Sequence, residues 1–172
     1  MNRVIVFLLA ACAFSSCKIY SFKDVSIPAE VKSIHIAYLE NRARLVNPQL
    51  APQLNDKLRQ KITGQASKLT QIQTSDADYD VSGYVSEYNY STSGIANQQA
   101  SSNRLSVTVH IIFKNHLDPT GRKVAPADFE ADVTRNFDFP ATQTIQDFET
   151  GQVATVVTNL TDEIFNKLFS NW

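Results

Sequence analysis

The sequence predicts an α+β fold, in which two helices pack on one face of a four-stranded sheet in the order β-α-β-β-β-α. Several segments alternate apolar and polar residues, which is the period of a strand with one buried face. Two other segments repeat apolar residues every three or four positions, as a helix with one apolar stripe does. We therefore expect a single face of the sheet to be buried under the two helices.

The N-terminal half contains one strand pattern and one helix pattern. The first strand is predicted at Lys32–Leu39, where Ile34, Ile36 and Tyr38 fall on one face. The helix is opened by Asn47-Pro48, and an apolar residue recurs at every fourth position: Leu50, Leu54, Leu58 and Ile62. Polar residues are expected off this stripe: Asn55, Asp56, Arg59 and Gln60. Pro52 fits the first turn, because its missing N–H costs little there.

The C-terminal half predicts three strands and a second helix. A strand is expected at Asp78–Tyr90, with Gly83 as a bulge, and the uncharged polar run Asn89–Asn103 is interpreted as an exposed loop. The next strand has a clear apolar face: Leu105, Val107, Val109, Ile111 and Phe113. A fourth strand alternates from Phe129 to Phe139. Polar residues of the last two strands share the opposite face: Ser106, Thr108, His110, Glu130, Asp132 and Thr134. The final helix starts near Ile145.

The N-terminus has the pattern of a lipoprotein signal peptide. Arg3 precedes an apolar run from Val4 to Phe14, which as a helix spans only about 16 Å of a roughly 30 Å hydrocarbon core. Residues 1–16 are therefore predicted to be removed, leaving Cys17 as the lipidated residue, with Cys12 as the alternative. Residues 17–30 then form a tether, and 31–172 a single domain.

Composition excludes several classes of partner and chemistry. The 16 basic and 17 acidic residues nearly cancel, so no nucleic-acid footprint is expected. The histidines His35, His110 and His116 have no metal-ligand spacing, and no phosphate loop or nucleophile motif is present. The acidic run Asp76, Asp78 and Asp80 resembles the start of a calcium loop but lacks its glycine and glutamate positions. We predict no catalytic residue, no metal site and no cofactor, and thus not an enzyme.

Short motifs spread along the chain resemble the LPS-assembly lipoprotein family LptE, in its Bacteroidota-type branch. The motifs are Tyr20-Ser21-Phe22, Ser26-Ile27-Pro28, Asn41 ahead of Asn47-Pro48, Asp78–Gly83, Arg104-Leu105-Ser106-Val107 and Asn171-Trp172. In this order, the motifs extend over almost the whole chain after Cys17. The resemblance also favours Cys17 as the lipidated residue, because family members place that cysteine just ahead of the Tyr-Ser-Phe element.

The resemblance implies an outer-membrane lipoprotein that faces the periplasm and carries only a covalent lipid such as palmitate. It would assemble and plug the LptD β-barrel and assist lipopolysaccharide insertion into the outer leaflet. The uncharged loop would meet the barrel through these residues: Ser91, Ser93, Gly94, Asn97 and Gln98. The residues that would contact lipopolysaccharide are Arg104, Arg122 and Lys123. The alternative is a free-standing periplasmic carrier of lipid or glycan, which predicts an apolar cavity.

Overall fold

The computed structural model describes residues 27–96, 99–117 and 126–169. The predicted signal peptide, both cysteines, the tether up to residue 26 and the terminal Asn171-Trp172 lie outside them. Arg122 and Lys123, and the loop residues Asn97 and Gln98, also lie outside.

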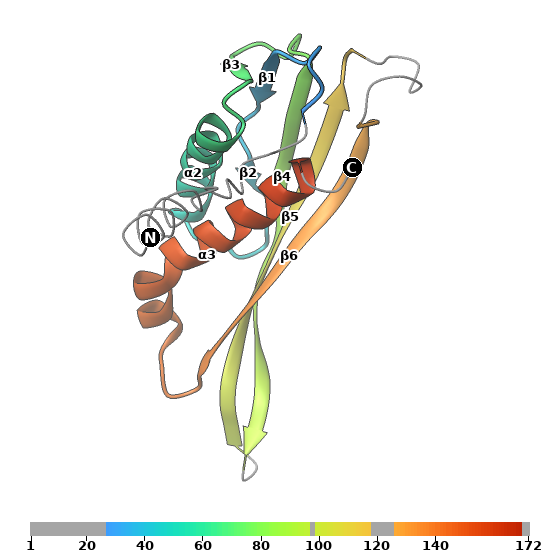
Figure 1. The fold of residues 1–172 in the computed structure, drawn as a ribbon. Helices are drawn as coiled ribbons and strands as arrows, with labels where there is room; N and C mark the ends of the chain where they lie inside the picture. The colour runs from blue at the N-terminus through green and yellow to red at the C-terminus, as the bar shows by residue number, and fades with distance from the viewer. Residues whose placement is uncertain (1–26, 97–98, 118–125, 170–172) are drawn as a thin grey trace, which may run out of the picture.

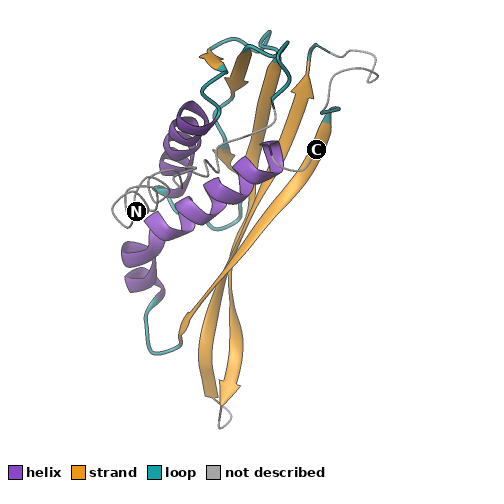
Figure 2. Cartoon of the chain, in the orientation of Figure 1, coloured by secondary structure: helices purple, strands orange, loops and turns teal. Residues whose placement is uncertain are grey.

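The described chain forms two layers, with both helices on one side of a single sheet (Figures 1 and 2). The elements are β1 Ser33–Ile36, β2 Glu40–Asn41, α2 Leu50–Gln65, β3 Thr70–Ile72, β4 Tyr79–Ala96, β5 Gln99–Asn115, β6 Phe129–Pro140 and α3 Ile145–Phe169. The sheet order is β3-β1-β4-β5-β6, and β2 also pairs with β4. Strand β1 pairs in parallel with β3 and β4, and β2 pairs in parallel with β4. Strands β4, β5 and β6 form an antiparallel meander.

The α+β class and the two helices are confirmed, but the predicted number of four strands is wrong. The described residues contain six strands, and the two additional ones, β2 and β3, have only two and three residues. Such short pieces carry no periodic pattern, and their pairing with the neighbouring strands is what defines them. The first strand is also shorter than predicted. Tyr38 is 52% exposed because the chain leaves strand geometry after Ile36.

The first helix, α2, has its stripe where it was predicted. The four stripe residues at every fourth position are fully buried: Leu50, Leu54, Leu58 and Ile62. The prediction for Asn55 was wrong, because this residue is also buried. Its side-chain oxygen accepts from the N–H of Leu39 at 2.8 Å, and its amide donates to the Leu39 carbonyl at 3.1 Å. Asn55 thus supplies hydrogen-bond partners for the backbone N–H and C=O of Leu39, which lies between β1 and β2 and has no strand partner there.

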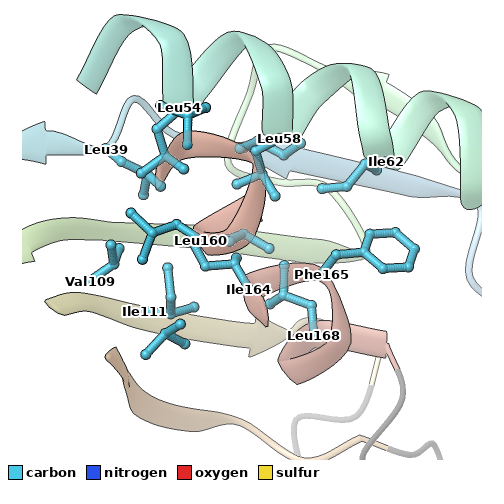
Figure 3. Close-up of a cluster of buried hydrophobic side chains, with 14 of the residues drawn as sticks. Leu39, Leu54, Leu58, Ile62, Val109, Ile111, Leu160, Ile164, Phe165 and Leu168 are labelled. Atoms are coloured by element: carbon cyan, nitrogen blue, oxygen red, sulfur yellow. The ribbon is translucent and has the colours of Figure 1, made fainter. Parts of the chain in front are cut away.

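The second helix, α3, begins at a capping pair. The Thr144 hydroxyl accepts from the N–H of Asp147 at 3.1 Å and donates to its carboxylate at 2.7 Å. Gly151 does not interrupt the helix. Lys61 of α2 and Asp162 of α3 form a 2.7 Å ion pair between the helices. The apolar faces of both helices meet the sheet in one continuous core (Figure 3).

The predicted loop at Asn89–Asn103 is wrong. Most of it forms the distal halves of β4 and β5, a ribbon that extends past the helices (Figure 1). Its polarity was mistaken for a loop signal, although Tyr, Ser and Thr also suit exposed strands. The bulge predicted at Gly83 is wrong too. The register shifts between Val85 and Glu87, and Gly83 remains in register with Ile111.

Candidate interaction site on the polar sheet face

The sheet face opposite the helices is polar, as the alternation of β5 and β6 predicted. The inward residues of β5 are at most 1% exposed: Leu105, Val107, Val109, Ile111 and Phe113. The outward residues of β4, β5 and β6 form cross-strand rows of hydroxyls, amides and charges. We call this surface the polar face.

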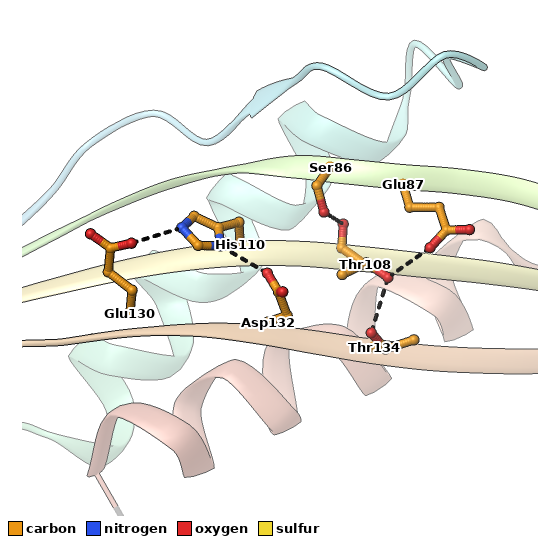
Figure 4. Close-up of polar contacts among 7 residues, drawn as sticks. All are labelled: Ser86, Glu87, Thr108, His110, Glu130, Asp132 and Thr134. Carbon is orange, nitrogen blue, oxygen red and sulfur yellow. Dashed lines mark hydrogen bonds and ion pairs between the residues drawn. The ribbon is translucent and has the colours of Figure 1, made fainter.

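His110 lies at the centre of one row, between two carboxylates of β6 (Figure 4). Its Nδ1 is 2.8 Å from Asp132, its Nε2 is 3.4 Å from Glu130, and its ring lies 5.2 Å from that of Tyr84. The pKa of His110 is raised, chiefly by the hydrogen bond to Asp132 and further by the charge of Glu130. Desolvation acts in the opposite direction and lowers this pKa. His110 thus lies on the polar face, as the alternation predicted, and contacts both carboxylates there.

The next row is neutral at its centre. The hydroxyl of Thr108 lies 3.0 Å from that of Thr134 and 3.3 Å from the carboxylate of Glu87 (Figure 4). Ser86, at the bulge of β4, donates to the Thr108 carbonyl at 3.3 Å. The bulge therefore leaves a serine side chain available to bond the neighbouring strand.

Arg104, predicted to contact lipopolysaccharide, is held by Asp138. Two nitrogens of its guanidinium donate to the two carboxylate oxygens at 2.8 and 3.0 Å. This hydrogen-bonded pair lowers the pKa of Asp138 and raises that of Arg104. An anionic ligand at this position would compete with Asp138 or share the guanidinium with it.

Three residues predicted to meet a barrel partner lie on the β4 side of the ribbon. Ser91 is in register with Arg104, and Ser93 donates to the Ser102 hydroxyl at 3.0 Å. A Cβ at Gly94 would lie 2.5 Å from that same hydroxyl oxygen, so the glycine allows a close cross-strand approach. These residues therefore belong to a paired strand rather than to a loop.

A hydroxyl cluster fixes the base of the ribbon to α3. Tyr88 and Tyr90 both donate to the Glu149 carboxylate at 2.8 Å, and Asn47 reaches the Tyr88 hydroxyl at 3.4 Å. Burial raises the pKa of Tyr88 to about 12. Sequence reasoning did not identify this cluster, because Glu149 lies far from the tyrosines along the chain.

The acidic run Asp76, Asp78 and Asp80 lies at the start of β4. The Asp78 carboxylate accepts from the backbone N–H groups of Lys32 and Ser33 at 2.7 and 2.9 Å. Asp80 lies 2.6 Å from Nδ1 of His35. Across the described ranges, no three His, Cys, Asp or Glu side chains gather in the way a metal ion needs. Neither described helix has the length and hydropathy required to cross a membrane.

The geometry defines a two-layer α+β protein with one buried apolar core and an open polar face, a class suited to binding a partner. The family model for LptE, lipopolysaccharide-assembly, matches residues 31–168. The chain belongs to this family, which confirms the resemblance in the sequence. It is accordingly an outer-membrane lipoprotein of lipopolysaccharide assembly. The family is non-enzymatic, has no known cofactor and works with the lipopolysaccharide transport machinery.

Solved structures are similar to this chain in fold. Rare lipoprotein B from Shewanella oneidensis has a TM-score of 0.52 at 9% identity, over 80% of this chain and 93% of that chain. The hypothetical protein CT253 from Chlamydia trachomatis has a TM-score of 0.53 at 8% identity, over 80% and 95%. Protein XCC0632 from Xanthomonas campestris has a TM-score of 0.52 at 11% identity, over 85% and 88%. No curated protein matches the sequence.

Proposed function

We propose that this lipoprotein is the subunit of the lipopolysaccharide translocon that assembles and plugs an LptD-type β-barrel and assists lipopolysaccharide insertion into the outer leaflet. Its acyl chains, on Cys17, hold it at the outer membrane facing the periplasm. The observation that carries the proposal is the polar face of β4, β5 and β6, which the helices leave uncovered (Figure 2).

The chemistry of the polar face suits a hydrated barrel lumen, whose lining is also polar. Its central charges are paired within the face, as in His110 with Asp132 and Arg104 with Asp138. Moving a paired charge out of bulk water costs less than moving a single one. The hydroxyls of Ser106 and Thr108 can form further hydrogen bonds with the hydrated lining of the barrel.

The ribbon is the element that we place deepest in the barrel. Ser91, Ser93 and Gly94, together with Asn97 and Gln98 of the adjoining segment, form the proposed contact with the barrel. A paired ribbon holds its shape better than the predicted loop, so less conformational entropy is lost on insertion. For lipopolysaccharide we propose Arg104 as the first contact, with Arg122 and Lys123 as further cations.

The carrier alternative is not favoured by the core. The side chains between the sheet and the helices pack into one cluster, including Leu58, Val109 and Leu160, each fully buried (Figure 3). A lipid carrier needs a cavity of several hundred Å³ in this position.

Co-purification with the barrel in mild detergent tests the proposal. Thr134→Arg places a bulky cation on the polar face and is expected to reduce the recovered barrel strongly. Thr155→Arg, the same change at an exposed position of α3, is the matched control and is expected to leave recovery unchanged. Depletion of the lipoprotein is expected to leave the barrel misassembled and the outer membrane permeable to large hydrophobic antibiotics. An intact barrier after depletion would refute the proposal.

The anchor is tested separately by labelling cells with palmitate. Cys17→Ala is expected to abolish incorporation into the lipoprotein, whereas Cys12→Ala is expected to retain it. The reverse result would assign the lipid to Cys12.

A further inference from the structure

The side of β4 that faces away from β5 is covered only along its first half. Residues Tyr79–Val81 pair with β1, and Tyr84 and Val85 pair with β2. From Ser86 to Ile95, no strand of the described residues pairs with this side. We call this stretch the outer β4 edge.

Backbone groups point toward the outer β4 edge at alternate residues. The carbonyl of Val85 faces that side, because it accepts from the N–H of Arg42 at 2.9 Å. The alternation of an antiparallel ladder, continued past the bulge at Val85/Glu87, directs the N–H and C=O groups of Tyr88, Tyr90 and Thr92 to the same side. These are the groups that an added strand would bond.

The two outer edges of the meander differ in their protection. The β6 edge contains charges and a proline, which block further pairing: Glu130, Asp132, Arg135, Asp138 and Pro140. The outer β4 edge has neither a charge nor a proline between Tyr88 and Ile95. A long uncharged edge of this kind is a template for another strand.

A groove lies beside the start of the outer β4 edge. It encloses about 480 Å³ and is lined by Arg44, Leu45 and residues 86–89. Leu45 and the adjacent Val46 are 46% and 61% exposed, although both are large apolar residues. Arg44 and Glu87 bring opposite charges to the same groove. The edge thus offers backbone bonds along its length and an apolar contact at one end.

We infer that the outer β4 edge is a strand-addition site that binds an extended segment of the barrel partner. The identity of that partner rests on the proposed function. The segment is uncharged opposite Tyr88–Ile95, because no residue of that stretch could pair a buried charge. It places an apolar side chain against Leu45 and Val46. It continues along β4 the pairing that β1 and β2 begin.

The test uses the full-length lipoprotein, co-expressed with the barrel and extracted in mild detergent. Thr92→Pro removes one N–H from the outer β4 edge without removing a bond to β5. Ile145→Pro is the control for the added proline, because Ile145 is an exposed residue at the first position of α3, away from the polar face, where proline is tolerated. We expect Thr92→Pro to lower the recovered barrel about tenfold, as the loss of one or two hydrogen bonds would. Ile145→Pro should leave the recovery unchanged.

A second pair of variants keeps the backbone intact in case proline perturbs folding. Thr92→Lys places a charge on the outer β4 edge, and Thr155→Lys makes the same change at an exposed position of α3. Only the first should reduce recovery. In the wild-type complex, hydrogen exchange of the peptide covering Tyr88–Ile95 should slow about tenfold relative to the isolated lipoprotein, because added strand bonds protect its amides.

The outcomes separate the inference from the proposed function. A wild-type lipoprotein that purifies without the barrel overturns both. If the barrel is recovered equally with wild type, Thr92→Pro and Thr92→Lys, and no amide is protected, the inference is wrong and the proposed function stands. If Thr92→Cys cross-links to a second copy of the lipoprotein instead of the barrel, the edge serves self-assembly and the inference is also wrong.

Discussion

Gly83 of β4 and His110 of β5 approach so closely that a Cβ on Gly83 would lie 2.1 Å from the His110 carbonyl oxygen. The obstructing atom belongs to the backbone, so no side-chain rotation relieves the contact. The two strands can pair at this separation only with glycine at position 83.

Gly83→Ala is therefore expected to lower the free energy of unfolding by about 2–4 kcal/mol, since the strands must separate locally. Gly151→Ala is the matched control. It lies within α3 with open space around it, and should raise stability by about 0.5–1 kcal/mol. Urea unfolding of both variants measures the difference. Equal stability of the two variants would contradict the close approach.

The tie between the ribbon and α3 gives a second prediction. Glu149→Ala removes the shared acceptor of Tyr88 and Tyr90, which leaves two largely buried hydroxyls without their carboxylate. We expect a loss of about 1–3 kcal/mol in unfolding free energy and faster hydrogen exchange in the ribbon. Gln146→Ala, at an exposed position one turn earlier, should change neither quantity.

Stability should depend on pH through His110. Its pKa is raised in the folded protein above the ordinary value of 6.5, chiefly by the hydrogen bond to Asp132. A raised folded pKa stabilises the protein fully below the unfolded pKa, and this stabilisation is lost as pH rises through the folded pKa. The advantage of wild type over Asp132→Asn should therefore be largest near about pH 5.5 and vanish by about pH 9.

Thermal unfolding across this pH range, with NMR titration of the His110 ring, measures the effect. Glu130→Gln should produce a smaller change, because its oxygen is 3.4 Å from the ring rather than 2.8 Å. An advantage of wild type that grows with pH would contradict the assignment.

The ion pair between Arg104 and Asp138 predicts opposite effects of its two partners on lipopolysaccharide binding. Asp138→Asn releases the guanidinium from its charged partner and should tighten binding severalfold, whereas Arg104→Gln should weaken it. Both residues are exposed, so neither change should alter stability appreciably. Equal binding by both variants would exclude Arg104 as a contact. Arg59→Gln, which removes one of the cations of α2, is the control for charge alone.

The sequence by itself determined the helices and the division of the sheet into two faces. Burial of one face of a helix or strand imposes a local periodicity on its apolar residues. The helix stripe Leu50, Leu54, Leu58 and Ile62 and the alternation of Leu105–Phe113 both have this periodicity. The polar face, including His110 and Thr108, could be read in the same way, because outward residues are fixed once inward ones are known.

Tertiary structure decided the remaining features. The short β2 and β3, the burial of Asn55 and the cluster around Glu149 depend on partners distant in sequence, whose positions no local pattern encodes. The ribbon was mistaken for a loop because its polar residues suit either state, and only pairing with β5 makes them a strand. Hydrogen bonds between distant segments, rather than residue preference, settle the structure wherever both faces of an element are exposed.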